Sequence, residues 1–323
     1  MASLSSAIPN LGQRWKVIAC FDIGGSAIKA ALARTPSEIE VVGTLPTPLD
    51  SFDAFSDALS SLLPPEAGAK SPVAVAIAGV VDPASGRIKV ANIPCLDGRP
   101  LAAELGEKLG RPVVVANDAD CFALAEATQG AGRGKRIVFG AILGTGVGGG
   151  LVIDGRLLQG AGGFAGEWGH GPISATRAGN PPADIPRLSC PCGQTGCLDT
   201  LGGARGLERL HAHLCGETLS SKAILDAWEA GEPHAARTVD VYVDLVAGPL
   251  AMVINVVGAE IVPVGGGLSN ARALVARLNE AVRARILRQT DGPLLVPAEC
   301  RIEPGLIGAA NLAWTEGPHA VAA

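Results

Sequence analysis

Three glycine-rich turns, each placed directly after a β-rich run, constrain the fold of this chain more than any other feature. They lie at residues 24–26, 144–150 and 265–267. Glycine lets backbone N–H groups approach a phosphate closely, and glycine turns at strand ends are typical of α/β proteins that bind nucleotides. The three turns together predict an α/β protein that holds a nucleoside triphosphate between two domains.

Strand and helix patterns alternate along the chain, which is the order of an α/β protein. The β-rich runs are Val17–Ile23, Ala30–Ala33, Val41–Leu45, Val73–Ala78, Val113–Ala116, Ile137–Leu143, Val147–Ile153 and Glu260–Val264. Helical spacing is found at Phe52–Leu63, Leu101–Leu109, Cys121–Thr128, Leu207–Leu214, Ala223–Ala230, Ala235–Val257, Ala271–Arg288 and Gly305–Trp314.

The 323 residues are enough for about two domains. A glycine-rich stretch, Gln129–Gly134, follows the first set of elements and reads as a linker. We expect a small α/β domain at 16–129, closed by a C-terminal helix at 304–318, and a larger α/β domain at 130–303.

Charge and hydropathy exclude several classes of protein. The 26 basic residues are outnumbered by 31 acidic ones and form no basic cluster, so we expect no binding to nucleic acid or to an anionic membrane. The most apolar run, Leu245–Ala259, is interrupted by Pro249 and falls short of the roughly 20 residues of a membrane span. Met1–Gln13 lacks the pattern of a signal peptide. We therefore expect a cytoplasmic protein.

The first turn follows a strand as Asp22-Ile23-Gly24-Gly25-Ser26. Its glycines and the Ser26 hydroxyl are suited to phosphate oxygens, and Asp22 is suited to Mg²⁺ or its waters. An ordinary tight turn has the same composition, so this motif alone leaves both interpretations open.

The second turn, Gly144-Thr145-Gly146 and the residues after it, contains a G-x-G-x-x-G pattern. A dinucleotide fingerprint needs a helix after the glycines, but Leu151–Ile153 reads as a strand. We expect a hairpin in which Thr145 can reach a phosphate and which no helix faces, so an NAD-dependent oxidoreductase is a remote alternative. In the third turn, Gly265 and Gly266 can contact a nucleoside, or Ser269 and Asn270 can cap the next helix.

Asn117-Asp118 follows a strand directly and precedes a helix. Ligands of α/β sheets bind at the carboxyl ends of strands, where an Asp can act as general base towards a hydroxyl. The alternative is that Asp118 or Asp120 caps the helix.

A metal site is predicted by Cys190, Cys192 and Cys197, spaced C-x-C-x4-C, with His170 twenty residues earlier. Three thiolates and one imidazole complete the tetrahedral shell of Zn²⁺ and leave no position for a catalytic water. The expected zinc is therefore structural.

With these motifs the chain resembles the ROK family of bacterial sugar kinases, over about Val17 to Trp314. The resemblance rests on Asp22–Ser26, Ala78–Asp82, Asn92–Pro94, Asn117-Asp118, Gly144–Gly150, Gly166–His170, the cysteine cluster and Gly265–Gly267. It implies a two-domain actin-like ATPase (ribonuclease H-like) fold with the active site in an interdomain cleft. It further implies a homodimer.

The resemblance also implies roles for individual residues. Asp118 would be the catalytic base. The sugar would be held by Gly79, Asn92, Asn117, Asp118, Glu167, His170 and Asp199, and ATP and Mg²⁺ by Asp22, Gly24, Gly25, Ser26, Gly144, Thr145, Gly146, Gly265 and Gly266. His170 would both touch the sugar and bind zinc.

The implied reaction is ATP-dependent phosphorylation of the 6-hydroxyl of an N-acetylhexosamine. N-acetylglucosamine kinases resemble the chain most, through residues 45–48, 117–124 and 265–270; glucokinase and N-acetylmannosamine kinase are alternatives. A transcriptional repressor of the family would need a helix-turn-helix domain, for which the sixteen residues before Val17 are too few. The family usually has Thr at Ser26 and Glu at Asp199, and the shorter Asp puts substrate preference in question.

Overall fold

The computed structural model describes residues 17–68, 70–300 and 303–315, which pack as two compact units. Unit 1 comprises the chain up to Cys121 together with the chain from Gly305, and unit 2 comprises Phe122–Pro304. Residues 1–16 and 316–323 lie outside the described residues. The expectation about Met1–Gln13 therefore concerns residues that the structure does not describe, as do the first and last residues of the expected small domain. The expected boundary at 129/130 stays a prediction.

Unit 1 is built on a five-stranded sheet with the order β3-β2-β1-β4-β7. β1 pairs antiparallel with β2 and parallel with β4, and β4 pairs parallel with β7. All five strands were predicted from their apolar runs. Their bounds are β1 Ile18–Ile23, β2 Ala27–Ala33, β3 Ile39–Pro46, β4 Val73–Ile77 and β7 Val113–Asn117, and a short hairpin, β5 Val80–Val81 with β6 Ile88–Lys89, was not predicted.

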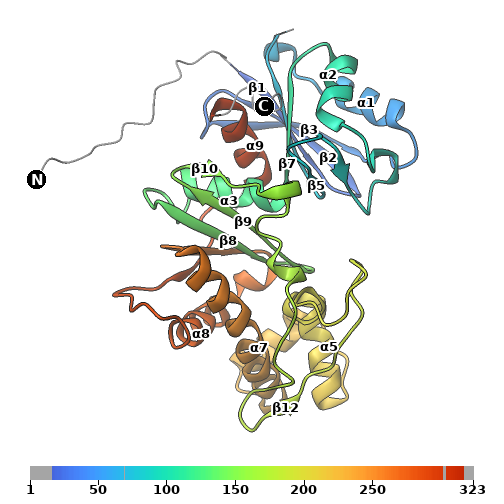
Figure 1. Ribbon diagram of the computed structural model, residues 1–323. Coiled ribbons are helices and arrows are strands. Elements are labelled where there is room, and N and C mark those ends of the chain that lie inside the picture. Colours follow the sequence, from blue (N-terminus) through green and yellow to red (C-terminus); the bar gives the residue numbers. More distant parts are fainter. Residues whose placement is uncertain (1–16, 69, 301–302, 316–323) are drawn as a thin grey trace, which may run out of the picture. The chain divides into compact units, whose positions relative to one another are not determined.

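The side chains of this sheet differ between its two faces. One face contributes Phe21, Val75 and similar large residues to a core shared with Phe55 and Leu105, because alternate residues of a strand point to opposite sides. Figure 1 shows the helices that carry these residues, α1 (Phe52–Ser61) and α2 (Leu101–Leu109), lying next to each other on the sheet. The unit also contains the start of α3 (Asp118–Thr128), α9 (Pro304–Thr315), and the short helices η1 (Pro65–Ala67) and η2 (Pro94–Leu96).

Unit 2 repeats this sheet order. Its strands run β10-β9-β8-β13-β14, with β8 antiparallel to β9 and parallel to β13, and with β13 parallel to β14. The repetition explains why two of the three glycine turns occupy equivalent places, each between the first two antiparallel strands of its sheet. The bounds are β8 Ile137–Leu143, β9 Val147–Ile153, β10 Arg156–Leu157, β13 Val262–Gly265 and β14 Leu295–Pro297.

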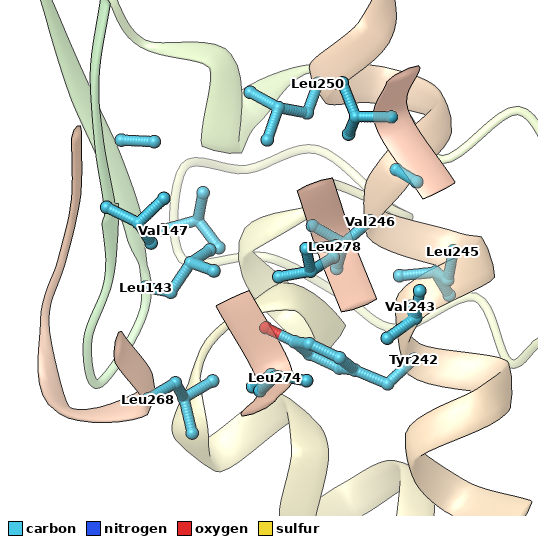
Figure 2. Packing of buried hydrophobic residues seen from close by; sticks show 14 of the residues in the cluster. Leu143, Val147, Tyr242, Val243, Leu245, Val246, Leu250, Leu268, Leu274 and Leu278 are labelled. Carbon is cyan, nitrogen blue, oxygen red and sulfur yellow. The ribbon is translucent and has the colours of Figure 1, made fainter. Parts of the chain in front are cut away.

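The core of unit 2 forms around helix α7 (Pro233–Val257). Figure 2 shows Tyr242, Val246 and neighbouring side chains of α7 packed with residues of β8, β9 and α8. Tyr242 is fully buried, and its hydroxyl donates a hydrogen bond of 2.6 Å to the carbonyl oxygen of Gly202. The other elements are η3 Ala161–Gly163, η4 Trp168–His170, β11 Arg177–Ala178, β12 Ala183–Asp184, α4 Asp199–Gly202, α5 Ala204–Cys215, α6 Ser221–Glu229, η5 Gly267–Asn270 and α8 Arg272–Arg283.

The expectation that no segment is long enough and apolar enough for a membrane span was wrong. Helix α7 begins at Pro233, well before the apolar run at Leu245, and by length and composition alone it could cross a membrane. Of its most apolar window, 56% is buried inside the protein. This burial is what the core helix of a globular unit requires, so the helix itself is weak evidence for a membrane span.

Candidate active site

The carboxyl ends of the parallel strands of unit 1 meet at one edge of the sheet. Asp22 on β1 pairs in register with Ala76 on β4, and one residue further Ile77 pairs with Asn117 on β7. Side chains at these positions therefore lie on neighbouring strands at the same level. The start of helix α9 also lies at this edge of the sheet: a Cβ atom added to Gly305 would be 2.9 Å from Oδ2 of Asp22.

Asn117 links this edge to the start of helix α3. Its Oδ1 accepts the N–H of Ala119 at 2.8 Å and that of Asp120 at 3.3 Å, which is the pattern of an N-cap. Its Nδ2 donates to the carbonyl oxygen of Gly79 at 3.0 Å, so two of the predicted sugar-binding residues are in contact. The cap is thus Asn117, and the alternative that Asp118 or Asp120 serves chiefly as cap is wrong.

Asp118 lies at the first position of α3 with its surface exposed, so a ligand can reach it. The protein around the carboxyl group removes part of its hydration, and this desolvation raises the pKa of Asp118 above its ordinary value of 3.8. The N–H of Ala119, 2.9 Å from Oδ1, opposes the increase by stabilising the charged form. The group is accessible and more basic than a fully hydrated aspartate.

The first glycine turn is closed by a hydrogen bond of 3.0 Å from the N–H of Gly24 to the carbonyl oxygen of Ala27. Within the described part of the chain, the N–H groups of Gly25 and Ser26 donate to no backbone acceptor. A Cβ atom on Gly25 would lie 3.1 Å from Nδ2 of Asn92, so the predicted phosphate turn and Asn92 are in contact. Two backbone donors and the exposed Ser26 hydroxyl are available here to an anion.

The second turn joins β8 to β9 as a hairpin, with Gly144 N–H donating to the Gly146 carbonyl oxygen at 3.0 Å. The strand after the glycines confirms that this is no dinucleotide fingerprint. The expectation that no helix faces the turn was wrong: α5 begins against it, and the N–H of Ala204 donates to the Gly144 carbonyl oxygen at 2.7 Å. Gly144 and Ala204 are sixty residues apart in the chain, so no local sequence pattern indicates that they are in contact.

The third turn packs directly on the second. Gly266 has φ +83°, and a Cβ atom there would lie 2.4 Å from the carbonyl carbon of Leu143 and 2.5 Å from Gly144 N. The predicted helix cap at Ser269 or Asn270 was wrong. The short helix η5 occupies these residues, Ser269 Oγ donates to the Gly266 carbonyl oxygen at 2.7 Å, and α8 begins later, at Arg272.

Asp199 lies beside the second turn. Its Oδ1 accepts the N–H of Val147, the first residue of β9, at 2.7 Å. A cavity of about 470 Å³ opens next to this contact, lined by Thr145, Gly146, Leu188, Ser189, Pro191, Asp199, Thr200, Arg205 and Arg209. Arg205 and Arg209 were not predicted as site residues, although their i, i+4 spacing places them on the same face of a helix.

The segment with Glu167 and His170 packs along β9. Trp168 Nε1 donates to the Gly148 carbonyl oxygen at 2.7 Å, and a Cβ atom on Gly149 would lie 2.9 Å from the Trp168 ring. The later glycines of the 144–150 motif therefore make room for this segment. His170 Nε2 faces Glu167, 3.8 Å from its Oε2.

The predicted metal ligands gather in one cluster. His170 Nδ1 is 3.6 Å from Cys190 Sγ, Cys192 Sγ is 3.7 Å from Cys197 Sγ, and the four ligand atoms lie within 4.8 Å of one another. Zn–S bonds of about 2.3 Å in a tetrahedron imply S–S distances of about 3.8 Å, so the donor set fits zinc. The Gln194 N–H lowers the pKa of Cys192 to about 7, whereas burial raises that of Cys197 to about 12.

The predicted site residues thus form two groups, one in each unit. Unit 1 brings together the ends of β1, β4 and β7, the first turn and Asn92. Unit 2 brings together the second and third turns, Asp199, the Glu167–His170 segment and the metal cluster. These contacts make unit 1 a candidate for proton abstraction and phosphate binding, and unit 2 a candidate for phosphate and hydroxyl binding.

The chain is similar to known proteins over almost its whole length. The model of the ROK family matches residues 18–316. The N-acetylgalactosamine kinase AgaK of Shewanella sp. strain ANA-3 is 37% identical over 294 residues, which cover 90% of this chain and 94% of the relative. The N-acetyl-D-glucosamine kinase of Escherichia fergusonii is 36% identical over 296 residues, covering 90% and 97%.

A solved structure has the same fold. The ROK hexokinase of Thermus thermophilus superposes with a TM-score of 0.77 at 29% sequence identity, covering 91% of this chain and 97% of the hexokinase. The expected actin-like ATPase fold is therefore confirmed.

Proposed function

The chain belongs to the ROK family, and from this premise we propose that it is an ATP-dependent sugar kinase acting on the 6-hydroxyl of N-acetylglucosamine. Its curated relatives are kinases of N-acetylhexosamines, and each is covered over nearly its full length. The products are the sugar 6-phosphate and ADP.

The proposal depends on Asp118. Asp118 is an exposed residue at the end of a parallel strand, the neighbouring Asn117 takes the capping role, and partial desolvation of its carboxyl group raises the pKa of Asp118. A carboxylate with these properties can accept the proton of the 6-hydroxyl as its oxygen attacks the γ-phosphorus. General-base assistance of this kind contributes roughly 10²–10⁴ in rate.

The glycine turns would bind the phosphates of ATP. The Gly25 and Ser26 N–H groups of unit 1 and Thr145 in the Gly144–Gly146 turn of unit 2 would supply donors without adding charge, and Gly265 and Gly266 would lie beside the nucleoside. Phosphoryl transfer depends mainly on positioning and electrostatics, so fixed donors of this kind are the main contribution of the chain. Asp22 would hold Mg²⁺ or its waters, and the ion would neutralise phosphate charge.

We assign the sugar hydroxyls to Gly79, Asn92, Asn117, Glu167, His170 and Asp199. Asn117 contacts Gly79, and Asn92 contacts the first turn. These side chains would therefore be held in position before the sugar binds.

We further propose a structural zinc ion held by His170 Nδ1, Cys190, Cys192 and Cys197. Such an ion would fix the orientation of the His170 ring, because Nδ1 would be a ligand while Nε2 faces Glu167. Four protein ligands leave no open position, so the ion would support the site without taking part in the reaction.

N-acetylgalactosamine is a second candidate substrate, because the relative with 37% identity carries the name of that kinase. The two sugars differ only in the orientation of the hydroxyl at carbon 4. A single hydrogen bond to that hydroxyl is enough to separate them, since a buried polar partner left unpaired costs about 1–3 kcal/mol.

A coupled ADP-release assay over N-acetylglucosamine, N-acetylgalactosamine, N-acetylmannosamine and glucose tests the proposal. We expect the highest kcat/KM with N-acetylglucosamine. A higher value with N-acetylgalactosamine would make that sugar the preferred substrate. Equal turnover of glucose would contradict the proposed preference for an N-acetylated sugar. No ADP release with any of these sugars would overturn the proposal that the chain is a sugar kinase.

Asp118→Asn tests the base with almost no change in size. We expect kcat to fall by about 10²–10⁴ while the KM values for both substrates stay within a few-fold, because the amide cannot accept the proton. An unchanged kcat would remove Asp118 from the mechanism.

For the molecule as a whole we propose a cytoplasmic homodimer, which meets ATP and free sugar in that compartment. Cell fractionation tests the location. Light scattering at micromolar concentration tests the assembly, and a mass of one chain would contradict it.

A further inference from the structure

The last residue of β3 and the two residues after it, Pro46-Thr47-Pro48, form a short segment that lies against the first glycine turn. We infer that Thr47 is a positioning residue for nucleotide binding: it orients the turn so that the Gly25 N–H points to the phosphate. This inference rests on the proposed use of the turn for ATP.

Thr47 makes two hydrogen bonds to the turn. Its side-chain Oγ1 donates to the carbonyl oxygen of Gly24 at 2.7 Å, and its backbone N–H donates to that of Ser26 at 3.2 Å. Only 8% of the surface of Thr47 is exposed. One buried residue therefore binds the carbonyl groups on both sides of Gly25.

These bonds determine where the donor of the turn points. In a trans peptide the C=O and N–H groups are coplanar and point in opposite directions. Because the Gly24 carbonyl oxygen is held towards Thr47, the N–H of Gly25 points away from it. Gly25 is flexible and carries no side chain, so without this bond its N–H would sample other directions.

The flanking prolines restrict Thr47 itself. Proline has a fixed φ and no N–H, and a residue that precedes proline is confined to extended conformations. Thr47 is thus the only residue of the three that can donate a backbone hydrogen bond to the turn. Much of the conformational entropy of the segment is lost before any nucleotide binds.

The far end of the segment is also anchored. Cys95 N–H donates to the Leu49 carbonyl oxygen at 3.0 Å, and Cys95 Sγ lies 3.7 Å from the Pro48 carbonyl oxygen. The segment is held at both ends, between the turn and the η2 region that follows Asn92. Thr47 therefore acts from a rigid support.

Thr47→Val removes the hydroxyl and keeps the shape of the side chain, and Thr47→Ser keeps the hydroxyl. We expect Thr47→Val to raise the dissociation constant of Mg-ATP about tenfold, equal to about 1.4 kcal/mol, and Thr47→Ser to stay within about threefold. Binding of adenosine, which has no phosphate, should not change in either variant. Thr44→Val, on the exposed part of β3, is the matched control and should behave as the unchanged protein.

Titration calorimetry gives these constants without turnover. An inactive chain that binds Mg-ATP would overturn the proposed kinase while leaving Thr47 testable. Equal Mg-ATP affinity in Thr47→Val and the unchanged protein, equal loss in Thr47→Ser, or equal loss for adenosine would overturn the role of Thr47. If Thr47→Val does not fold by circular dichroism, Thr47→Ala removes the same bond and the same criteria apply.

Discussion

Asp199 Oδ1 accepts a 2.7 Å hydrogen bond from the N–H of Val147, at the point where β9 leaves the second glycine turn. Since a Cβ atom at Gly146 would lie only 2.2 Å from Asp199 Oδ1, the carboxylate already fills the space beside the turn. The Asp199 side chain thus packs directly against the turn.

This contact predicts a difference between two variants of Asp199. Asp199→Asn keeps an oxygen acceptor for Val147, so we expect the KM for ATP to stay within about threefold. Asp199→Ala leaves a buried N–H unpaired, a loss of about 1–3 kcal/mol, so we expect that KM to rise about tenfold or more. Steady-state kinetics at saturating sugar measure both; identical KM values in the two variants would contradict a role for the bond.

The pKa of Asp118 predicts the acid limb of the pH profile. The base acts only when ionised, so kcat/KM is fully present above the pKa of Asp118 and falls by a factor of ten per pH unit below it. Because desolvation raises this pKa from 3.8, the decline should begin at a higher pH than an unperturbed aspartate would give. A profile that stays flat to pH 4, with the fold intact by circular dichroism, would be incompatible with this assignment.

The Cys190, Cys192, Cys197 and His170 cluster predicts one zinc ion per chain. Metal analysis of protein prepared without added metal measures it, and Cys192→Ser should lower both the zinc content and the thermal midpoint. The KM for the sugar should rise as His170 loses its fixed orientation. Cys215→Ser, a half-buried cysteine outside the cluster, is the control. Native protein free of zinc would refute the site.

Gly266 and Gly267 are adjacent, but their surroundings differ. Gly266 has φ +83° and backbone atoms 2.4 Å from an added Cβ, whereas a Cβ on Gly267 meets nothing within 4 Å. We expect Gly266→Ala to lower the free energy of unfolding by roughly 2–5 kcal/mol, from the strained φ and the overlap together, and Gly267→Ala to change it by less than about 1 kcal/mol. Urea unfolding of both variants makes the comparison; equal stabilities would show that the two turns do not pack as described.

Much of the fold follows from local patterns. The apolar runs predict β1, β4, β7, β8, β9 and β13 to within a few residues, and helical spacing predicts α1, α2, α3 and α7, because these elements depend on side-chain periodicity over less than thirty residues. The short strands of two or three residues were missed, since they have no period to detect.

The candidate site was predicted less evenly. Cys190, Cys192 and Cys197 lie within eight residues, so their chemistry is visible in the chain itself. The cap at Asn117, the approach of α5 to Gly144 and the contact of Arg205 with the cavity beside Thr145 were not predicted. Each depends on the direction in which a polar group points, and composition does not encode that direction.

The amino-acid sequence by itself determined the alternation of strands and helices, the glycine turns and the set of residue types available for phosphate, sugar and metal. Only the tertiary structure decided which partner each of them takes: Thr47 with Gly24, Asn117 with Gly79, Asp199 with Val147. These pairs are 23, 38 and 52 residues apart. They form because sheet register and helix packing bring distant backbone groups within hydrogen-bond distance, and buried polar groups must be paired there.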